Sequence, residues 1–433
     1  MTSSNLSDTT MKESPTGSRE AFKVWLEIGL LSFGGPAAQI ALMHKKIVAE
    51  NRWLSEKQYI NALSFCMLLP GPEAMQLATY SGWRLHGIKG GLVAGLLFVL
   101  PGAFVILVLA SLYIVSGTLP IIDALFLGVK AVVIVIVIEA LLRVAKRALS
   151  LPEHWIIALA AFIGIFFFEV SFPLIVVAAG ITGFLRSKSN TDAKPTQMEL
   201  PSMMWPTIKT VLAGLLAWVT PLLLIALFTD NTFLLELGAF FSKLAVVTFG
   251  GAYAVLAYLA QDVVLEFGWL TTGEMMDGLG LAETTPGPLI LVTEFVGFLA
   301  GYREGGFLMG VAAAGLTLWV TFVPCFIWIF AGAPYIEWIG EQPRLKGALS
   351  AITAAVVGVI LNLSVWFALH VLFTDVTSQH YGPLTLWTPD WATLDGKVVV
   401  LTLLSAVAIL VWHWSIVRVL ALSAIAGAMT VLL

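Results

Sequence analysis

Long apolar stretches separated by short polar loops follow one another from position 22 to the end of the chain. Most of them reach the roughly 20 residues that a helix needs to cross a bilayer. The pattern therefore predicts an all-α polytopic membrane protein. The expected membrane segments are 22–43, 59–82, 91–114, 121–142, 207–229, 278–300, 306–333 and 347–370. Two further stretches, 155–185 and 398–433, are interrupted and predict pairs of shorter arms.

The pattern is also repeated. The sequence Pro70-Gly71-Pro72 recurs as Pro286-Gly287-Pro288, 216 positions later, inside another apolar stretch. Because several motifs share this offset, the chain is predicted to contain two copies of one unit. The other paired motifs are Phe33-Gly34-Gly35 with Phe249-Gly250-Gly251, and Trp53-Leu54 with Trp269-Leu270.

The repeat and the polar stretches divide the chain into parts. The first 20 residues are polar and lack an apolar core, so we expect a disordered tail rather than a cleaved signal peptide. The predicted parts are a tail at 1–20, a first repeat at 21–185, a linker at 186–206, a connecting transmembrane segment at 207–236 and a second repeat at 237–433.

Lys and Arg are distributed unevenly among the loops. Loops 44–58, 83–90 and 143–154 are basic, whereas 261–277 and 374–396, in the second repeat, contain no Lys or Arg. Because basic loops stay in the cytoplasm, the two repeats are predicted to lie in inverted orientation, with the N-terminal tail cytoplasmic.

The loops on both sides of segment 59–82 are basic, so this segment is expected to enter and leave on one side as a re-entrant hairpin that turns at Pro70-Gly71-Pro72. By the same argument, segment 22–43 turns back at Gly34-Gly35.

Each Pro-Gly-Pro must interrupt its helix, because proline lacks the backbone donor. An interruption within a membrane is tolerated where it is buried in protein or lines a cavity, and paired interruptions indicate a transporter's binding site. Helix N-termini exposed at such breaks carry partial positive charge, and glycine lets the backbone approach a ligand. This construction suits a tetrahedral oxyanion. In the alternative interpretation, Pro and Gly only let helices kink and pack closely.

The candidate substrate-binding residues are the breaks themselves, the polar residues beside them and one lysine deep in segment 121–142. In the first repeat they are Ser32, Gly34, Gly35, Gln39, Asn61, Pro70, Gly71, Pro72, Glu73, Gln76 and Lys130. In the second repeat they are Thr248, Gly250, Gly251, Glu283, Thr285, Pro286, Gly287 and Pro288. A lysine at such depth is usually functional, although its stem could also snorkel to the interface. Weaker candidates for proton coupling are Glu27, Glu169 and Glu294.

Composition excludes several classes of protein. The chain is 59% hydrophobic and 12% charged, with a mean hydropathy of +0.93, which a soluble protein could not bury. The six His residues are scattered, and no nucleotide-binding Gly-x-x-x-x-Gly-Lys-[Ser/Thr] motif occurs, so we expect no metal site, no cofactor and no ATP-driven step. A membrane-embedded enzyme acting on a lipid would need clustered Asp, Glu or His residues. The acids here are dispersed, so this is a minor alternative.

At these residues the chain resembles the chromate ion transporter (CHR) family in its long form of two homologous halves. The resemblance runs from about Ala21 to Ala368 and rests on six motifs. They are Ser32-Phe33-Gly34-Gly35-Pro36, Trp53-Leu54, Leu69-Pro70-Gly71-Pro72, Thr248-Phe249-Gly250-Gly251, Trp269-Leu270 and Thr285-Pro286-Gly287-Pro288.

The resemblance implies a bacterial inner-membrane protein that exports chromate, driven by the membrane potential or an ion gradient, and confers chromate resistance. Sulfate, which has the same shape and charge, is implied as a competitor. An importer or carrier of sulfate or another oxyanion on the same scaffold stays open, as does a homodimer. No nucleic-acid partner is expected. Because Glu73–Gln76 has no counterpart in Leu289–Val292, any site is expected to be only pseudo-symmetric.

Overall fold

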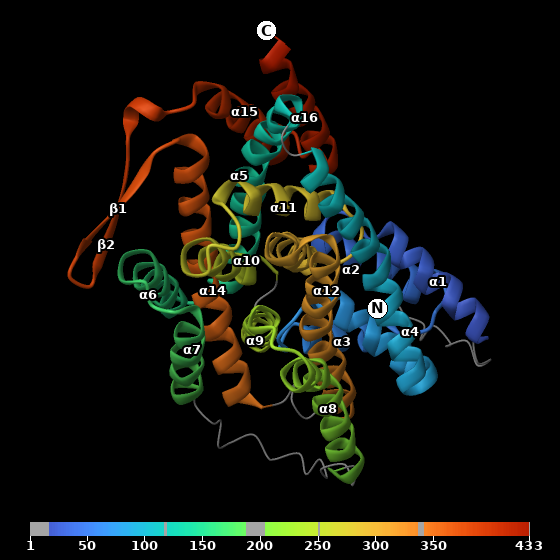
Figure 1. Cartoon of the computed structure of the whole chain (residues 1–433). Coiled ribbons are helices and arrows are strands. Elements are labelled where there is room, and N and C mark those ends of the chain that lie inside the picture. The colour runs from blue at the N-terminus through green and yellow to red at the C-terminus, as the bar shows by residue number, and fades with distance from the viewer. Residues whose placement is uncertain (1–16, 117–118, 188–203, 250–251, 337–341, 433) are drawn as a thin grey trace, which may run out of the picture.

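The computed structural model describes residues 17–116, 119–187, 204–249, 252–336 and 342–432. These residues form helices apart from one short β-hairpin, so the predicted all-α fold of a multi-pass membrane protein is confirmed (Figure 1). Five helices of the described chain are long and apolar enough to cross a membrane: Glu73–Val115, Pro120–Ala148, Trp205–Phe228, Leu289–Tyr335 and Pro343–Leu372.

The described residues of the first repeat form seven helices and one π-helical turn. They are α1 (Ser18–Leu31), α2 (Gly35–His44), the π-helical turn Lys45–Glu50, α3 (Glu56–Cys66), α4 (Glu73–Ser116), α5 (Pro120–Ala148), α6 (Pro152–Phe168) and α7 (Phe172–Arg186).

Helix α8 (Met204–Phe228) leads into the second repeat. That repeat contains α9 (Thr232–Val247), α10 (Ala252–Gln261), the π-helical turn Asp262–Glu266, α11 (Thr272–Thr284), a 3₁₀ turn at Leu289–Leu291, α12 (Val292–Gly332), a 3₁₀ turn at Ala333–Tyr335, α14 (Pro343–Leu372), β1 (Val376–Tyr381), β2 (Leu384–Pro389), a 3₁₀ turn at Trp391–Thr393, α15 (Gly396–Ala406), the π-helical turn Val407–Val411 and α16 (Ile416–Leu432).

The repeat extends to small details of the backbone. Helix α3 begins with a capping box, in which Ser55 and Gln58 each bond the backbone of the other, and α11 begins with the same arrangement of Thr271 and Glu274. Both α4 and α12 are bent, at His86–Gly87 and at Gly305–Gly306. Glycine supplies the positive φ that each bend requires, +62° at Gly87 and +75° at Gly306.

Several loop predictions need correction, because 44–58, 143–154 and 261–277 are partly helical, and two further stretches differ more. Stretch 83–90 is mostly helix and contains only the bend at His86–Gly87, because the chain continues in helical geometry on both sides. Stretch 374–396 contains the antiparallel pair β1–β2, which runs in register from Val376↔Pro389 to Tyr381↔Leu384. Hydropathy alone did not reveal it, because its Thr, Tyr and Trp residues favour strands without forming an apolar segment. The predicted interruptions in 155–185 and 398–433 are present between α6 and α7 and between α15 and α16.

The ends of the two repeats are exchanged. Helices α15 and α16 of the second repeat pack on α5 of the first, and α6 and α7 of the first repeat pack on α14 of the second (Figure 1). Glycines permit these close contacts, because a Cβ on Gly128 would lie 1.9 Å from the Ser423 carbonyl oxygen and one on Gly358 would lie 2.0 Å from that of Ala158. Each terminal helix pair therefore belongs structurally to the opposite repeat.

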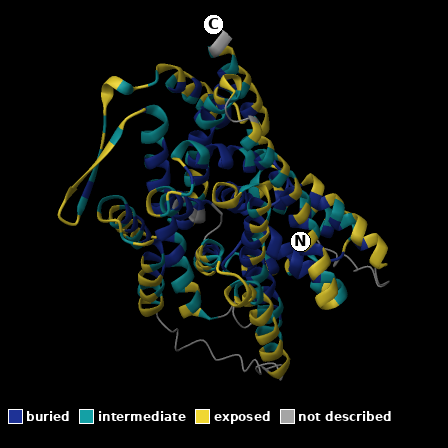
Figure 2. Ribbon diagram, in the orientation of Figure 1, coloured by how far each residue is buried: buried dark blue, intermediate teal, exposed yellow. Residues whose placement is uncertain are grey.

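The remaining helices form the centre of the molecule. Helix α4 packs against α1 and α12, and α12 packs against α8 and α9. Buried residues lie where these elements meet, whereas α8 turns mostly exposed residues outward (Figure 2). Near this centre lie three of the interruptions that the sequence predicts as functional, and the described part of the fourth, Thr248 and Phe249.

Candidate functional site

The interruptions of the two repeats are hydrogen-bonded to one another. Ser32 and Thr248 each occupy the centre of an inverse γ-turn, with φ and ψ of −78° and 59° and of −74° and 72°. The Gly287 N–H donates to the Ser32 carbonyl oxygen at 2.9 Å, and the Gly71 N–H donates to the Thr248 carbonyl oxygen at 2.8 Å. The Pro-Gly-Pro turn of each repeat is thus anchored to the Phe-Gly-Gly break of the other.

The long helices complete this reciprocal arrangement. A Cβ on Gly71, whose φ is +116°, would lie 2.7 Å from Cys325 Sγ on α12. A Cβ on Gly102 of α4 would lie 2.0 Å from the Pro286 carbonyl oxygen. Because the Gly71 and Gly287 amides already donate to carbonyl groups, neither is free to bind an anion in this conformation.

Most of the predicted polar side chains donate hydrogen bonds to backbone carbonyl groups of the turns and helices. Gln39 Nε2 donates to the carbonyl oxygens of Ser32 and Gly287, at 3.1 and 2.6 Å, and Gln76 Nε2 donates to that of Pro70 at 2.7 Å. The remaining hydroxyl groups bond back to their own helices, as Ser and Thr commonly do. These are Ser32 to Ile28 O, Thr248 to Leu244 O and Thr285 to Ala282 O.

The other predicted residues lie in different surroundings. Asn61 is exposed, and Pro70, Pro72, Pro286 and Pro288 are buried within the turns. Gly34 and Gly35 have φ of +84° and +75° and open the first break. Gly250 and Gly251 lie outside the described residues. Only Gly71 and Glu73 of the predicted set line the large cavity described next.

A cavity of about 430 Å³ lies beside the first Pro-Gly-Pro turn. On one side it is bounded by α2, the end of α3 and residues Leu68, Leu69 and Gly71. On the other side it is bounded by α5 and α14, and Tyr253 of α10 closes one end. The cavity therefore separates the first repeat's breaks from the two helices that carry the exchanged ends.

Three basic side chains line this cavity: Arg143 and Arg147 of α5 and Lys346 of α14. Arg143 pairs with Glu139, with 2.5 Å between Nη2 and Oε1. Among the described residues no carboxylate pairs with Arg147 or Lys346.

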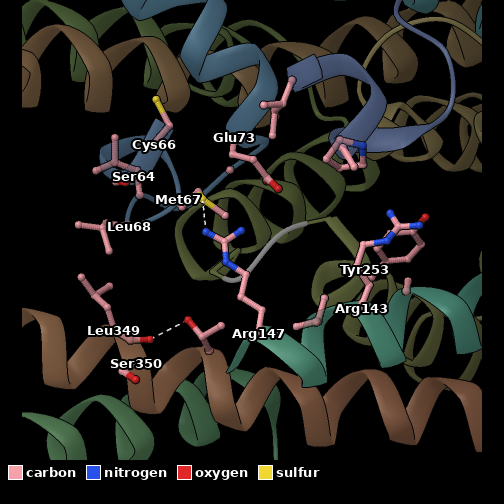
Figure 3. A pocket seen from close by; sticks show the side chains of 18 of the residues that line it. Ser64, Cys66, Met67, Leu68, Glu73, Arg143, Arg147, Tyr253, Leu349 and Ser350 are labelled. Atoms are coloured by element: carbon pink, nitrogen blue, oxygen red, sulfur yellow. Dashed lines mark hydrogen bonds between the residues drawn. The ribbon is translucent and has the colours of Figure 1, made fainter. Parts of the chain in front are cut away.

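Arg147 extends into the middle of the cavity, where its Nη2 is 2.8 Å from Met67 Sδ, and the Glu73 carboxylate points into the same space (Figure 3). A thioether is a weak acceptor, so the guanidinium keeps donors for a stronger one.

These basic residues were missed as site residues at the level of sequence, where Arg143 and Arg147 counted only toward the basic character of loop 143–154. Arg143 and Arg147 are four positions apart on one helix, so their side chains lie on the same face. That spacing was the available signal. Lys346 offered none, because its position depends on how α14 packs.

The corresponding region of the second repeat is closed. Helix α11 packs on α5, and α10 packs on α14. Lys130, predicted as a substrate contact, lies in this closed contact. Its Nζ is 3.3 Å from Asp277 Oδ1, and the Tyr113 hydroxyl donates to Asp277 Oδ2 at 2.8 Å. Asp277 is only 3% exposed, and the Lys130 ammonium group neutralises its buried negative charge.

The arrangement suits reversible binding of a small polyanion. Two cations without carboxylate partners line one cavity together with Ser64, Ser350 and Thr353. The Ser350 hydroxyl pairs with His154, and the Thr353 hydroxyl donates to the Leu349 carbonyl oxygen. The guanidinium fork can donate two parallel hydrogen bonds to an oxyanion, and the ammonium adds a compact charge. Among the described residues no group of His, Cys, Asp or Glu is arranged to hold a metal ion.

Comparison with known proteins agrees with the motifs. The family model described as "Chromate transporter" matches residues 19–184 and 235–428. The chain is 32% identical over 380 residues to the "Chromate transport protein" of Pseudomonas aeruginosa, which covers 86% of this chain and 85% of that protein. No solved structure matches the chain.

Two further relatives carry similar names. The chain is 27% identical over 342 residues to the "Probable chromate transport protein" of Synechococcus elongatus, covering 79% of this chain and 82% of the relative. It is 29% identical over 344 residues to the "Chromate transport protein" of Cupriavidus metallidurans, covering 79% and 80%. With both halves matched by the family model, the chain belongs to the chromate transporter family.

Proposed function

We propose that this protein is a secondary active transporter that exports chromate across the inner membrane and thereby confers chromate resistance. The observation that carries the proposal is the cavity beside Gly71, which Arg147 and Lys346 line without carboxylate partners. A dianion entering this space meets two cations that have no ion pair with a carboxylate among the described residues, although the Glu73 carboxyl group lies in the same cavity. The names of the relatives support chromate as the anion.

The reciprocal bonds between the breaks support an inverted repeat. Gly71 with Thr248, and Gly287 with Ser32, are the contacts expected of two units related by a two-fold axis. In such transporters one unit rocks against the other around a central site, and access alternates between the two sides. Here the cavity opens between α2–α3 and α5–α14, and the related contact in the second repeat is closed.

Chromate flux in vesicles of known orientation tests the proposal. Inside-out vesicles are expected to accumulate labelled chromate, and sulfate is expected to compete. Accumulation in right-side-out vesicles alone would favour an importer. Stronger transport of sulfate than of chromate would favour a sulfate carrier. Flux equal to that of vesicles without the protein would contradict transport altogether.

Orientation is tested separately by labelling single cysteines from outside intact cells. Position 266 is expected to react and position 52 is not, because position 52 lies in a basic loop, 44–58, whereas position 266 lies in a loop without Lys or Arg, 261–277. Both replacements belong in a background without Cys66 and Cys325, which are buried free thiols. Equal reaction at both positions would contradict the inverted arrangement.

A further inference from the structure

A buried carboxyl group lies behind the wall of the cavity. Glu283 is 5% exposed and stands near the C-terminal end of α11, four positions before Gly287. Its Oε1 accepts a hydrogen bond from the Tyr253 hydroxyl at 2.8 Å, and its Oε2 has no partner among the described residues. A carboxylate with a single neutral donor is poorly compensated when it is ionised away from water. Its chemistry therefore favours binding of a proton.

Few titratable groups of the described residues act on Glu283. They are Tyr253 from α10 and Arg143 and Glu139 from α5. Because Arg143 and Glu139 are bonded to each other, their opposite charges largely offset one another at Glu283. No ion pair of the described residues includes Glu283.

Tyr253 connects this carboxyl group to the cavity. It lines the cavity next to Arg143 (Figure 3), and its hydroxyl lies 4.0 Å from the place that a Cβ on Gly35 would occupy. A phenol hydroxyl has one hydrogen to donate and can also accept. While its hydrogen is directed to Glu283 Oε1, the hydroxyl has none to offer to a ligand in the cavity.

We propose that Glu283 is the proton-binding residue of the transporter, and that it takes up a proton when the oxyanion binds in the cavity. The inference rests on the proposed function. Ionised Glu283 places a negative charge behind the cavity wall and accepts the hydrogen bond that the Tyr253 hydroxyl donates. Once a hydronium ion of the cavity water has protonated the carboxylate, the new O–H donates to the tyrosine oxygen. The tyrosine hydrogen then turns toward the cavity and donates to the oxyanion.

Thermodynamic reciprocity follows from this exchange of donors. If the proton strengthens anion binding, the anion strengthens proton binding by the same factor. Chromate affinity is therefore expected to fall as the pH rises through the titration of Glu283. The protein is expected to take up about one proton for each chromate dianion that it binds.

Proton uptake on binding tests the proposal in the full-length protein. Chromate is added, at an alkaline pH where it is a dianion, to detergent-solubilised protein in weakly buffered indicator solution. The wild-type protein is expected to take up protons in proportion to the chromate bound. Glu283→Gln is expected to bind chromate at least as tightly, because Gln resembles the protonated carboxyl, but to take up none. Retained binding also shows that this variant is folded.

Two further variants locate the effect. Tyr253→Phe keeps the ring and removes the hydroxyl, so it is expected to weaken chromate binding and to reduce proton uptake per bound anion. Glu294→Gln is the matched control, because Glu294 on α12 is also buried, at 2%, with an oxygen that lacks a partner, yet among the described residues it has no hydrogen bond to a cavity-lining residue like the one between Glu283 and Tyr253. It is expected to keep the uptake of the wild-type protein.

Three results would overturn the inference. Chromate binding without proton uptake in the wild-type protein would remove the coupling and leave the proposed function intact. Uptake that persists in Glu283→Gln, or is lost only in Glu294→Gln, would place the proton elsewhere. Absence of chromate binding in the wild-type protein would overturn the proposed function, and this inference with it.

Discussion

The two Pro-Gly-Pro turns have similar backbone conformations but face different surroundings. Gly71 and Gly287 have φ of +116° and +92°, and each donates to the γ-turn of the other repeat. Beyond Gly71 lies the cavity with Arg147, whereas beyond Gly287 the chain packs against Gly102 of α4. Identical local chemistry therefore produces an open side and a closed side.

Side chains explain which side is closed. On the closed side Lys130 of α5 pairs with Asp277 of α11. Counted from the proline that begins each helix, Lys130 corresponds to Thr353 of α14, and by the 216-residue offset Asp277 corresponds to Asn61. Threonine and asparagine cannot form an ion pair, so only one side has this contact. A single ion pair that occurs in only one of two similar repeats can therefore favour one conformation of the whole molecule.

The largest expected difference is in accessibility. Leu69 lines the cavity and Thr285, its counterpart, is 4% exposed. Without Cys66 and Cys325, Leu69→Cys is expected to react with a polar maleimide on the order of 100-fold faster than Thr285→Cys, since exposure of a buried thiol requires an opening costing a few kcal/mol. Stopped labelling with mass spectrometry measures both rates. Similar rates would contradict the asymmetry between the two sides.

Removal of the cavity charge is expected to have the next largest effect. Arg147→Gln is expected to weaken chromate binding about 10- to 150-fold, the equivalent of one or two charge-assisted hydrogen bonds. Lys146→Gln is the matched control, because it removes the same charge from the neighbouring position, which does not line the cavity. Equilibrium binding of labelled chromate distinguishes them. A comparable loss in both variants would indicate a general field effect instead of a contact.

The Lys130–Asp277 pair is expected to have an effect that its partner variant reverses. Lys130→Gln leaves the buried Asp277 charge without its cation, so it is expected to lower transport by on the order of tenfold and to reduce the amount of folded protein. Adding Asp277→Asn is expected to restore folding and to speed labelling of a cysteine at position 285, because no charge is left alone. A double variant that is folded but does not transport would assign Lys130 to the substrate instead.

The smallest effects are expected at positions where the two repeats have the same local structure. Ser55→Ala and Thr271→Ala each remove one half of a capping box that both repeats retain. Each is expected to lower the free energy of unfolding by about 1 kcal/mol. Thermal unfolding in detergent measures the two losses, which should be equal. Clearly unequal losses would show that the asymmetry between the sides extends to the helix starts.

The membrane helices, their repeat and the places where they break could be predicted from the amino-acid sequence. Apolar length fixes which segments form membrane helices, and a proline such as Pro70 ends a helix through its own missing donor. These are local effects, so they could be read without knowing what packs against them. The family motifs lie at the same breaks, for the same reason.

Which residues the breaks face depends on tertiary packing and could not be predicted. The exchange of α6–α7 with α15–α16, the anchoring of Gly71 on Thr248 and the cavity around Arg147 all join residues far apart in the chain. The hydropathy pattern gives α5 and α14 apolar faces but not their partners. Whether a basic residue at a helix end marks a loop or lines a site depends on which helix lies opposite, and long-range packing alone settles that.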